Sequence, residues 1–149
     1  MIRLVSASPA HVGRIANRLR EDDRIECAAF GRSPKEALRL GLRGGAFTLT
    51  ALADGEPHAM FGVTALNAIE GTGRPWFLGS ELVYDCARHL LTIGPHVIAQ
   101  MHRRFRRLEN VVSVRNVRAI RMLKRWGFEL GDEAMTIGGV DFVLFWREG

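Results

Sequence analysis

The chain has 149 residues, 47% of them hydrophobic and 25% charged, which fits one domain with a buried core over residues 1–149 and excludes a disordered chain. No run of about 18 or more apolar residues occurs, so we expect no membrane contact. The start of the chain lacks the charged-then-apolar layout of a secretory signal, and we therefore expect a cytoplasmic protein.

The formal net charge of +5 at pH 7 comes mainly from arginine, which gathers in two clusters at 103–107 and 115–125. Such clusters are typical of contacts with a phosphate-bearing cofactor, an acidic partner or nucleic acid, and also of a solvated helix face. Nucleic acid is the partner that the sequence favours least, because no aromatic-basic stacking pattern accompanies the arginines.

Only two cysteines occur, Cys27 and Cys86, and neither lies in a Cys/His pattern of the kind that binds metal. The spacing of His89, His96 and His102 is not that of metal ligands either. We therefore expect two free thiols and no metal site.

The first half of the chain predicts strands at 2–6, 46–53, 57–66 and 76–79, because each run is apolar or alternates apolar with polar residues. Asp54-Gly55 predicts a tight hairpin turn between the second and third strands. Ser8-Pro9 predicts the start of a helix over 12–19, and the Ser33 to Glu36 capping box predicts a second helix ending at Gly44-Gly45.

The second half begins with an apolar helical face from Leu90 to Phe105, which predicts a helix ending near Arg107, broken at Gly94-Pro95. A Val-rich strand at 110–114, a helix from Asn116 to Gly127 and a strand pair at 128–137 and 140–146 follow. The order β-α-α-β-β-β-α-β-α-β-β predicts an α/β (α+β) fold with a mixed sheet and helices on both faces.

The segment from Val114 to Phe128 reads Val-Arg-Asn-Val-Arg-Ala-Ile-Arg-Met-Leu-Lys-Arg-Trp-Gly-Phe. It resembles the Asn-x-x-Ala-x-x-(Leu/Met)-Tyr-x-x-x-Gly-Phe segment of the GCN5-related N-acetyltransferase (GNAT) superfamily, and the element order is similar over nearly the whole chain. The resemblance implies an acyl-CoA N-acyltransferase fold, acetyl-CoA as cofactor, and a small-molecule or protein amine as substrate.

A second, narrower resemblance rests on short strings. Ser33–Leu38, Ala59–Val63, Trp76–Gly79, Leu108–Asn110 and Arg115-Asn116 are similar to segments of a tailed-phage family that includes the T7-like internal virion protein A. Members of that family are similar to acetyltransferases in fold. This resemblance implies a phage protein with other phage proteins as partners, in the host cytoplasm or in the virion.

In the GNAT superfamily, the phosphates of CoA lie on backbone amides of an Arg/Gln-x-x-Gly-x-Gly/Ala loop. Residues 80–94 do not contain that loop, and Arg88 is the residue there that can pair with a phosphate. The resemblance implies the backbone of Leu78 and Gly79 as the edge that aligns the pantetheine arm. It also places Asn116 near the arm, although we expect its side chain first of all to cap the helix, and both roles can hold together.

Acyl transfer to an amine also needs a base for the amine proton and an acid for the leaving thiolate. Glu81 is the candidate base, and its alternative role is that of an exposed loop carboxylate. Leu123 stands where the superfamily motif has tyrosine, and leucine cannot donate a proton. The only tyrosine, Tyr84, is the remaining candidate acid, with packing as its alternative role.

Two functions therefore stay open, and either is compatible with a homodimer. The first is an acetyl-CoA-dependent N-acetyltransferase, and the second is a non-catalytic phage protein of the same fold that acts in virion assembly or host interaction. Both depend on one geometric expectation: the fourth and fifth strands part to leave a slot, with Asn116 at its mouth.

Overall fold

A single sheet of seven strands organises the computed structural model, which describes all residues, 1–149. The spatial order of the strands is β1-β2-β3-β4-β5-β7-β6. Neighbouring strands are antiparallel except for β4 and β5, which are parallel. The strands are β1 (Ile2–Ser6), β2 (Gly45–Ala53), β3 (Glu56–Asn67), β4 (Thr72–Gly79), β5 (Arg107–Ser113), β6 (Glu129–Ile137) and β7 (Val140–Glu148).

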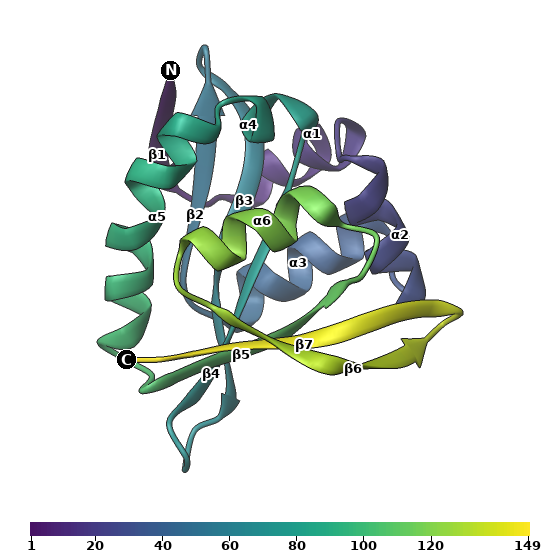
Figure 1. Ribbon diagram of the computed structural model, residues 1–149. Helices are drawn as coiled ribbons and strands as arrows, with labels where there is room; N and C mark the ends of the chain where they lie inside the picture. The colour runs from purple at the N-terminus through teal and green to yellow at the C-terminus, as the bar shows by residue number, and fades with distance from the viewer.

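Helices cover both faces of this sheet, as predicted. Figure 1 shows α5 and α6 in front of the sheet and α1, α2 and α3 behind it. One apolar core lies under α5 and α6, and a smaller one lies under α1 and α3. The helices are the 3-10 helix η1 (Pro9–His11), α1 (Val12–Asn17), α2 (Glu21–Ala29), α3 (Pro34–Gly44), α4 (Glu81–Asp85), α5 (Ala87–His102) and α6 (Val117–Arg125).

Local sequence signals account for several element boundaries. Ser33 and Glu36 form the predicted capping box at the start of α3, since the serine hydroxyl and the glutamate carboxylate each accept a backbone N–H. Asp54 and Gly55 both have positive φ, at 51° and 79°, which is what the tight turn between β2 and β3 requires. Both signals act within four residues and need no tertiary contact.

The parting of β4 and β5 is the feature that positions the site. The two strands pair only at Thr72 with Arg107 and at Gly73 with Leu108. Just beyond these pairs, the Asn110 side-chain amide donates to the Pro75 carbonyl oxygen at 2.8 Å, and no further β4–β5 backbone pairs follow. The predicted slot is therefore confirmed, and we call it the sheet gap.

Two predictions about helices are wrong. Residues 21–29 form a helix, α2, that the sequence did not predict, because only Asp23 and Cys27 of this helix are buried and no apolar stripe marks it. The predicted break at Gly94-Pro95 does not occur, since α5 runs through Pro95 and ends at His102. The break lies instead at Cys86, between α4 and α5.

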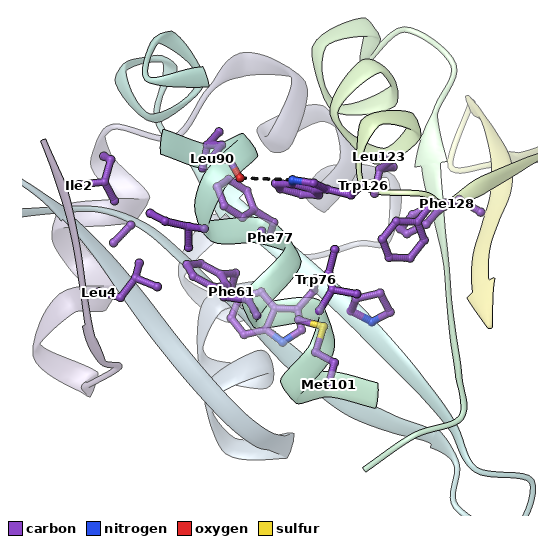
Figure 2. A pocket seen from close by; sticks show the side chains of 17 residues that line it. Ile2, Leu4, Phe61, Trp76, Phe77, Leu90, Met101, Leu123, Trp126 and Phe128 are labelled. Atoms are coloured by element: carbon purple, nitrogen blue, oxygen red, sulfur yellow. Dashed lines mark hydrogen bonds between the residues drawn. The ribbon is translucent and has the colours of Figure 1, made fainter. Parts of the chain in front are cut away.

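Gly94 serves a packing role rather than a break. A Cβ atom at this position would overlap the Trp126 indole, and the Trp126 Nε1–H donates to the Leu90 carbonyl oxygen at 3.2 Å (Figure 2). The indole thus packs the end of α6 against the middle of α5.

We predict that Gly94→Ala destabilises the protein by about 1–3 kcal/mol, because the added methyl displaces Trp126. Chemical denaturation followed by circular dichroism measures the change. Gly13→Ala is the matched control, since no atom lies within 4 Å of a Cβ there and alanine favours a helix. Equal stability of the two variants would contradict the packing role.

Candidate active site

A cavity of about 680 Å³ follows the sheet gap and reaches both faces of the sheet. On the α3 side it forms a groove between α3 and the β6–β7 hairpin, with β4 and β5 as its floor. On the other side it reaches α5 and α6 through Leu90, Ala119 and Trp126. We call the first part the α3 groove, and its lining includes Leu40, Gly41, Thr64, Leu66, Arg74, Trp76, Val111 and Leu144.

The start of α2 holds the end of β4. The Arg20 backbone N–H donates to the Gly79 carbonyl oxygen at 2.9 Å, and the Gly79 N–H donates to Asp23 Oδ2 at 2.9 Å. The Arg20 guanidinium also donates to Asp23 Oδ1 at 3.0 Å, and both side chains are almost fully buried. Both groups of Gly79 that face the sheet gap are therefore bonded within the chain.

The same helix holds the end of β5. Arg20 Nη2 donates to Asn116 Oδ1 at 2.7 Å, and Asn116 Nδ2 donates to Glu26 Oε2 at 3.1 Å. The same Glu26 oxygen accepts the Ser113 N–H at 2.9 Å. Arg20, Asp23, Glu26 and Asn116 thus join the two parted strands across the sheet gap, and we call these four residues the α2 bridge.

Glu26 is the residue of the α2 bridge whose pKa lies near neutral pH. Burial raises its pKa from 4.5 to about 7, against the opposing effect of the bonds from Ser113 and Asn116. Its side chain is only partly buried and lines the cavity. Near neutral pH, Glu26 is therefore both reachable and divided between its acid and its base form, as a general base should be.

Arg20 carries the fixed positive charge of the bridge. Its Nε and Nη1 donors are buried without a hydrogen-bond partner. The guanidinium lies 4.0 Å from the centre of the Tyr84 ring, which offers its electron-rich face to the cation. Burial raises the pKa of Tyr84, so the phenol stays neutral. A phenol with a raised pKa is a poor proton donor, and we assign no proton transfer to Tyr84.

Asn116 lies at the mouth of the sheet gap, but the expectation that its side chain caps α6 is wrong. It occupies the N-cap position without making a capping bond. Its oxygen accepts from Arg20 and its amide donates to Glu26. A bond from a charged donor is stronger than a neutral cap, so the side chain turns toward the bridge.

The predicted cofactor edge is divided between two directions. Gly79 turns its N–H and carbonyl into the sheet gap. The backbone of Leu78 faces β3 instead, because hydrogen-bonding direction alternates along an antiparallel strand and Leu78 is the next residue. The same alternation turns the backbone of Phe77 toward the gap.

The predicted residues on α4 and α5 lie outside the gap. Glu81 is exposed and accepts from Arg118 at 3.0 Å, and Asp85 accepts from the same guanidinium at 3.1 Å. Arg88 is exposed in the first turn of α5 and makes no ion pair. The structure therefore brings Gly79 and Asn116 together, with Tyr84 beside them, and leaves Glu81 and Arg88 at the surface.

These residues fit the pantetheine arm of acetyl-CoA and do not fit its diphosphate. The sheet gap presents Gly79, Phe77 and Asn116 to an extended arm, although an arm at Gly79 would replace the bonds from Asp23 and Arg20. The segment after β4 is the short helix α4 with two surface carboxylates. It provides no glycine-rich cradle of amides for a diphosphate.

Arg20, Asp23 and Glu26 were not predicted as site residues. Their only sequence signal is the run of acids in the first turn of α2, Glu21, Asp22 and Asp23, which favours a helix start. Their partners lie 56 to 96 residues away in the chain. Local spacing therefore carries no trace of the bridge.

A second, smaller cavity of about 110 Å³ lies between the sheet, α5 and the end of α6. Figure 2 shows its apolar lining, with Ile2 and Leu4 on one side, Phe61 and Phe77 on the sheet, and Trp126 and Phe128 opposite.

No group of three or more His, Cys, Asp or Glu side chains is arranged to hold a metal ion. No helix has both the length and the apolar character that crossing a membrane requires.

No protein-family model matches the sequence, and no curated protein matches it. Solved structures do match. An acetyltransferase of the GNAT family from Streptococcus pneumoniae has a TM-score of 0.65 at 17% identity, with 99% of each chain covered. A phosphinothricin acetyltransferase of the GNAT superfamily from Sinorhizobium meliloti, in complex with acetyl-CoA, has a TM-score of 0.70 at 21% identity, covering 99% of this chain and 88% of that one.

A ribosomal-protein-alanine N-acetyltransferase from Brucella melitensis matches with a TM-score of 0.67 at 15% identity, covering 98% of this chain and 99% of that one. These similarities extend over nearly the full length of the chains compared. The chain therefore has the GNAT acyl-CoA N-acyltransferase fold.

Proposed function

We propose that residues 1–149 form one domain that transfers an acetyl group from acetyl-CoA to a primary amine. The observation that carries the proposal is the cavity through the sheet gap, which joins the α3 groove to the α5–α6 side with Glu26 and Asn116 at the crossing. An acetyl donor on one face of the sheet and an amine acceptor on the other face can come into contact where the cavity passes through the sheet. The acetyl-CoA complex of the similar Sinorhizobium meliloti protein supports this choice of donor.

On the donor side, acetyl-CoA supplies an activated thioester. The chain's own contribution is positional. Phe77 offers backbone groups to the arm, Gly79 offers its own once the arm replaces the bonds from Asp23 and Arg20, and Asn116 offers its side-chain amide. Arg88 remains our candidate for a phosphate contact, since its guanidinium is exposed and makes no ion pair. Because the chain lacks an amide cradle for the diphosphate, contacts with the pantetheine arm provide most of the binding of acetyl-CoA.

On the acceptor side, Glu26 prepares the amine. An alkyl ammonium ion has no lone pair and must lose a proton before it attacks a carbonyl carbon. Because its pKa is about 7, Glu26 in its carboxylate form is a base strong enough to take that proton near neutral pH. The Ser113 N–H and the Asn116 amide fix the orientation of the receiving carboxylate. The free amine then attacks the thioester carbonyl, the C–S bond breaks, and the second proton of the amine passes to the leaving thiolate, so the products are the N-acetylated amine and CoA thiol.

We predict that Glu26→Gln lowers the rate of acetyl transfer about 100-fold or more, because glutamine cannot accept the proton. Acetyl-CoA binding should stay within about twofold, since the substitution keeps the shape of the side chain. Steady-state assays with a panel of amines and calorimetric titration with acetyl-CoA measure the two effects.

Glu81→Gln tests the other candidate base in the same assay, and the exposed Glu133→Gln serves as the control. A large loss in Glu81→Gln together with normal activity in Glu26→Gln would transfer the role of base to Glu81. Normal activity in both variants would reject a carboxylate base.

Glu26 also predicts how stability depends on pH. Its pKa is raised in the folded state, from 4.5 to about 7, so the folded chain holds this proton more tightly than the unfolded chain does. Stability is then lost as the pH rises through this window. Glu26→Gln should equal the wild type near pH 4 and exceed it at pH 8 by about 1–2 kcal/mol, a value reduced because the side chain is only partly buried. Urea denaturation at both pH values measures the difference.

Two observations favour a second function, that of a non-catalytic protein with this fold, for which a phage origin remains our proposal. Both gap-facing groups of Gly79 are bonded to α2, and the carboxylates of Glu81 and Asp85 lie after β4, where phosphates would need positive partners. Such a protein would act through protein contacts in virion assembly.

Acetyl-CoA separates the two functions. An enzyme should show a raised melting temperature with millimolar acetyl-CoA, because a ligand of the folded state stabilises it. Asp23→Ala removes the side chain that accepts the Gly79 N–H. It should therefore lower the melting temperature without ligand and tighten acetyl-CoA binding. No shift in the wild type and no transfer to any amine would favour the non-catalytic protein, and finding the chain in purified virions would support it directly.

A further inference from the structure

The α3 groove has a direction set by charge. At one end lie the carboxylates of Asp23 and Glu26, bonded to the amides of Gly79 and Ser113. Asp23 is paired with Arg20, so Glu26 is the carboxylate there that forms no ion pair. At the other end lies Arg74, two residues beyond the first of the two β4–β5 pairs. At a rise of about 3.3 Å per residue, the four to five residues from Arg74 to the end of β4 separate these two ends by about 13–16 Å.

Arg74 is a free cation at this end of the groove. It is exposed and forms no ion pair and no hydrogen bond through its side chain. The nearest acid on the facing strand, Glu109, is bonded to Arg107 at 3.0 Å. Arg74 shares its face of β4 with Trp76 and Leu78, because side chains two residues apart point the same way. Its guanidinium is therefore available to an anion in the groove.

The stretch between the two charged ends is apolar. Trp76 packs under Gly41 of α3, where any larger residue would overlap the indole. Leu40 and Leu66, which line the same stretch, are 42% and 37% exposed. Large aliphatic side chains left open to water along a groove favour an apolar ligand.

We infer that the acceptor is the amino terminus of a short apolar peptide with a carboxylate about four residues from the amine. This inference rests on the proposed function in taking the amine as the reacting group. The ammonium lies beside Glu26, the apolar side chains lie along Trp76 and Leu40, and the carboxylate pairs with Arg74. Four extended residues span about 13–14 Å, which matches the separation of the two ends of the groove.

The test is a calorimetric titration of the full chain, without acetyl-CoA, with an apolar tetrapeptide that has a free amine and a free carboxylate. N-terminal acetylation of the peptide should weaken binding about tenfold or more, since it removes the positive charge. C-terminal amidation should weaken binding to the wild type about tenfold. In Arg74→Ala, the acid and amide forms should bind equally.

Matched variants control for the surface position. Arg104→Ala removes another exposed arginine, outside the groove, and should keep the preference for the free carboxylate. Leu40→Ala should weaken all forms of the peptide, whereas Leu82→Ala, which is equally exposed at 41% against 42% for Leu40, should not. Each substituted side chain is exposed, so we expect all four variants to fold.

The outcomes separate this inference from the proposed function. Equal binding of the free and N-acetylated peptides, or the same carboxylate preference in Arg74→Ala as in the wild type, would overturn the inference. Acetyl transfer to other amines without tetrapeptide binding would also overturn it, while the proposed function stands. Tetrapeptide binding with the predicted pattern but no acetyl transfer would show that the groove binds peptides, and it would overturn both the acceptor role of the peptide and the proposed function.

Discussion

A buried arginine holds together the part of the fold where the sheet is weakest. Where β4 and β5 part, the hydrogen bonds between neighbouring strands are lost, and the free backbone groups need other partners. Arg20 brings these partners together, because its backbone N–H binds Gly79 while its guanidinium positions Asp23 and Asn116. The sheet can therefore open at Gly79 without leaving the backbone groups of that residue unpaired.

Such an arrangement is costly to assemble and costly to interrupt. Burying a charge removes it from water, and the ion pair with Asp23 together with the Tyr84 ring compensates only in part. Removing one partner would leave the other charged and buried. The same network that satisfies the strand edges also surrounds Glu26, whose burial raises its pKa to about 7 against the opposing effect of the bonds from Ser113 and Asn116. The side chains that support the parted strands thus include Glu26, the proton acceptor of the proposed function, and Asn116 contacts both Arg20 and Glu26.

The sequence predicted what short-range rules control. The capping box at Ser33, the positive-φ turn at Asp54-Gly55 and the strand-to-helix segment from Val114 to Phe128 each act over a few residues, and the GNAT-like order of elements followed from them. The helix α2 was missed because it is held by polar bonds to distant strands rather than by an apolar stripe. Asn116 was placed correctly and given the wrong partner, since Arg20 lies 96 residues away.

The two ends of the sheet gap differ in a way that bears on both proposed ligands. Toward Gly79, Asp23 is paired with Arg20, the carboxylate of Glu26 opposes an anion, and the Glu81–Arg118–Asp85 cluster offers no free cation to a diphosphate. Toward Arg74, a cation is free and the floor is apolar. Charge therefore distinguishes one amine substrate from another in the α3 groove more strongly than it distinguishes one acyl donor from another on the opposite side. Selectivity of this chain should then arise mainly from the amine, with the donor held through its arm and positioned by the strand edges.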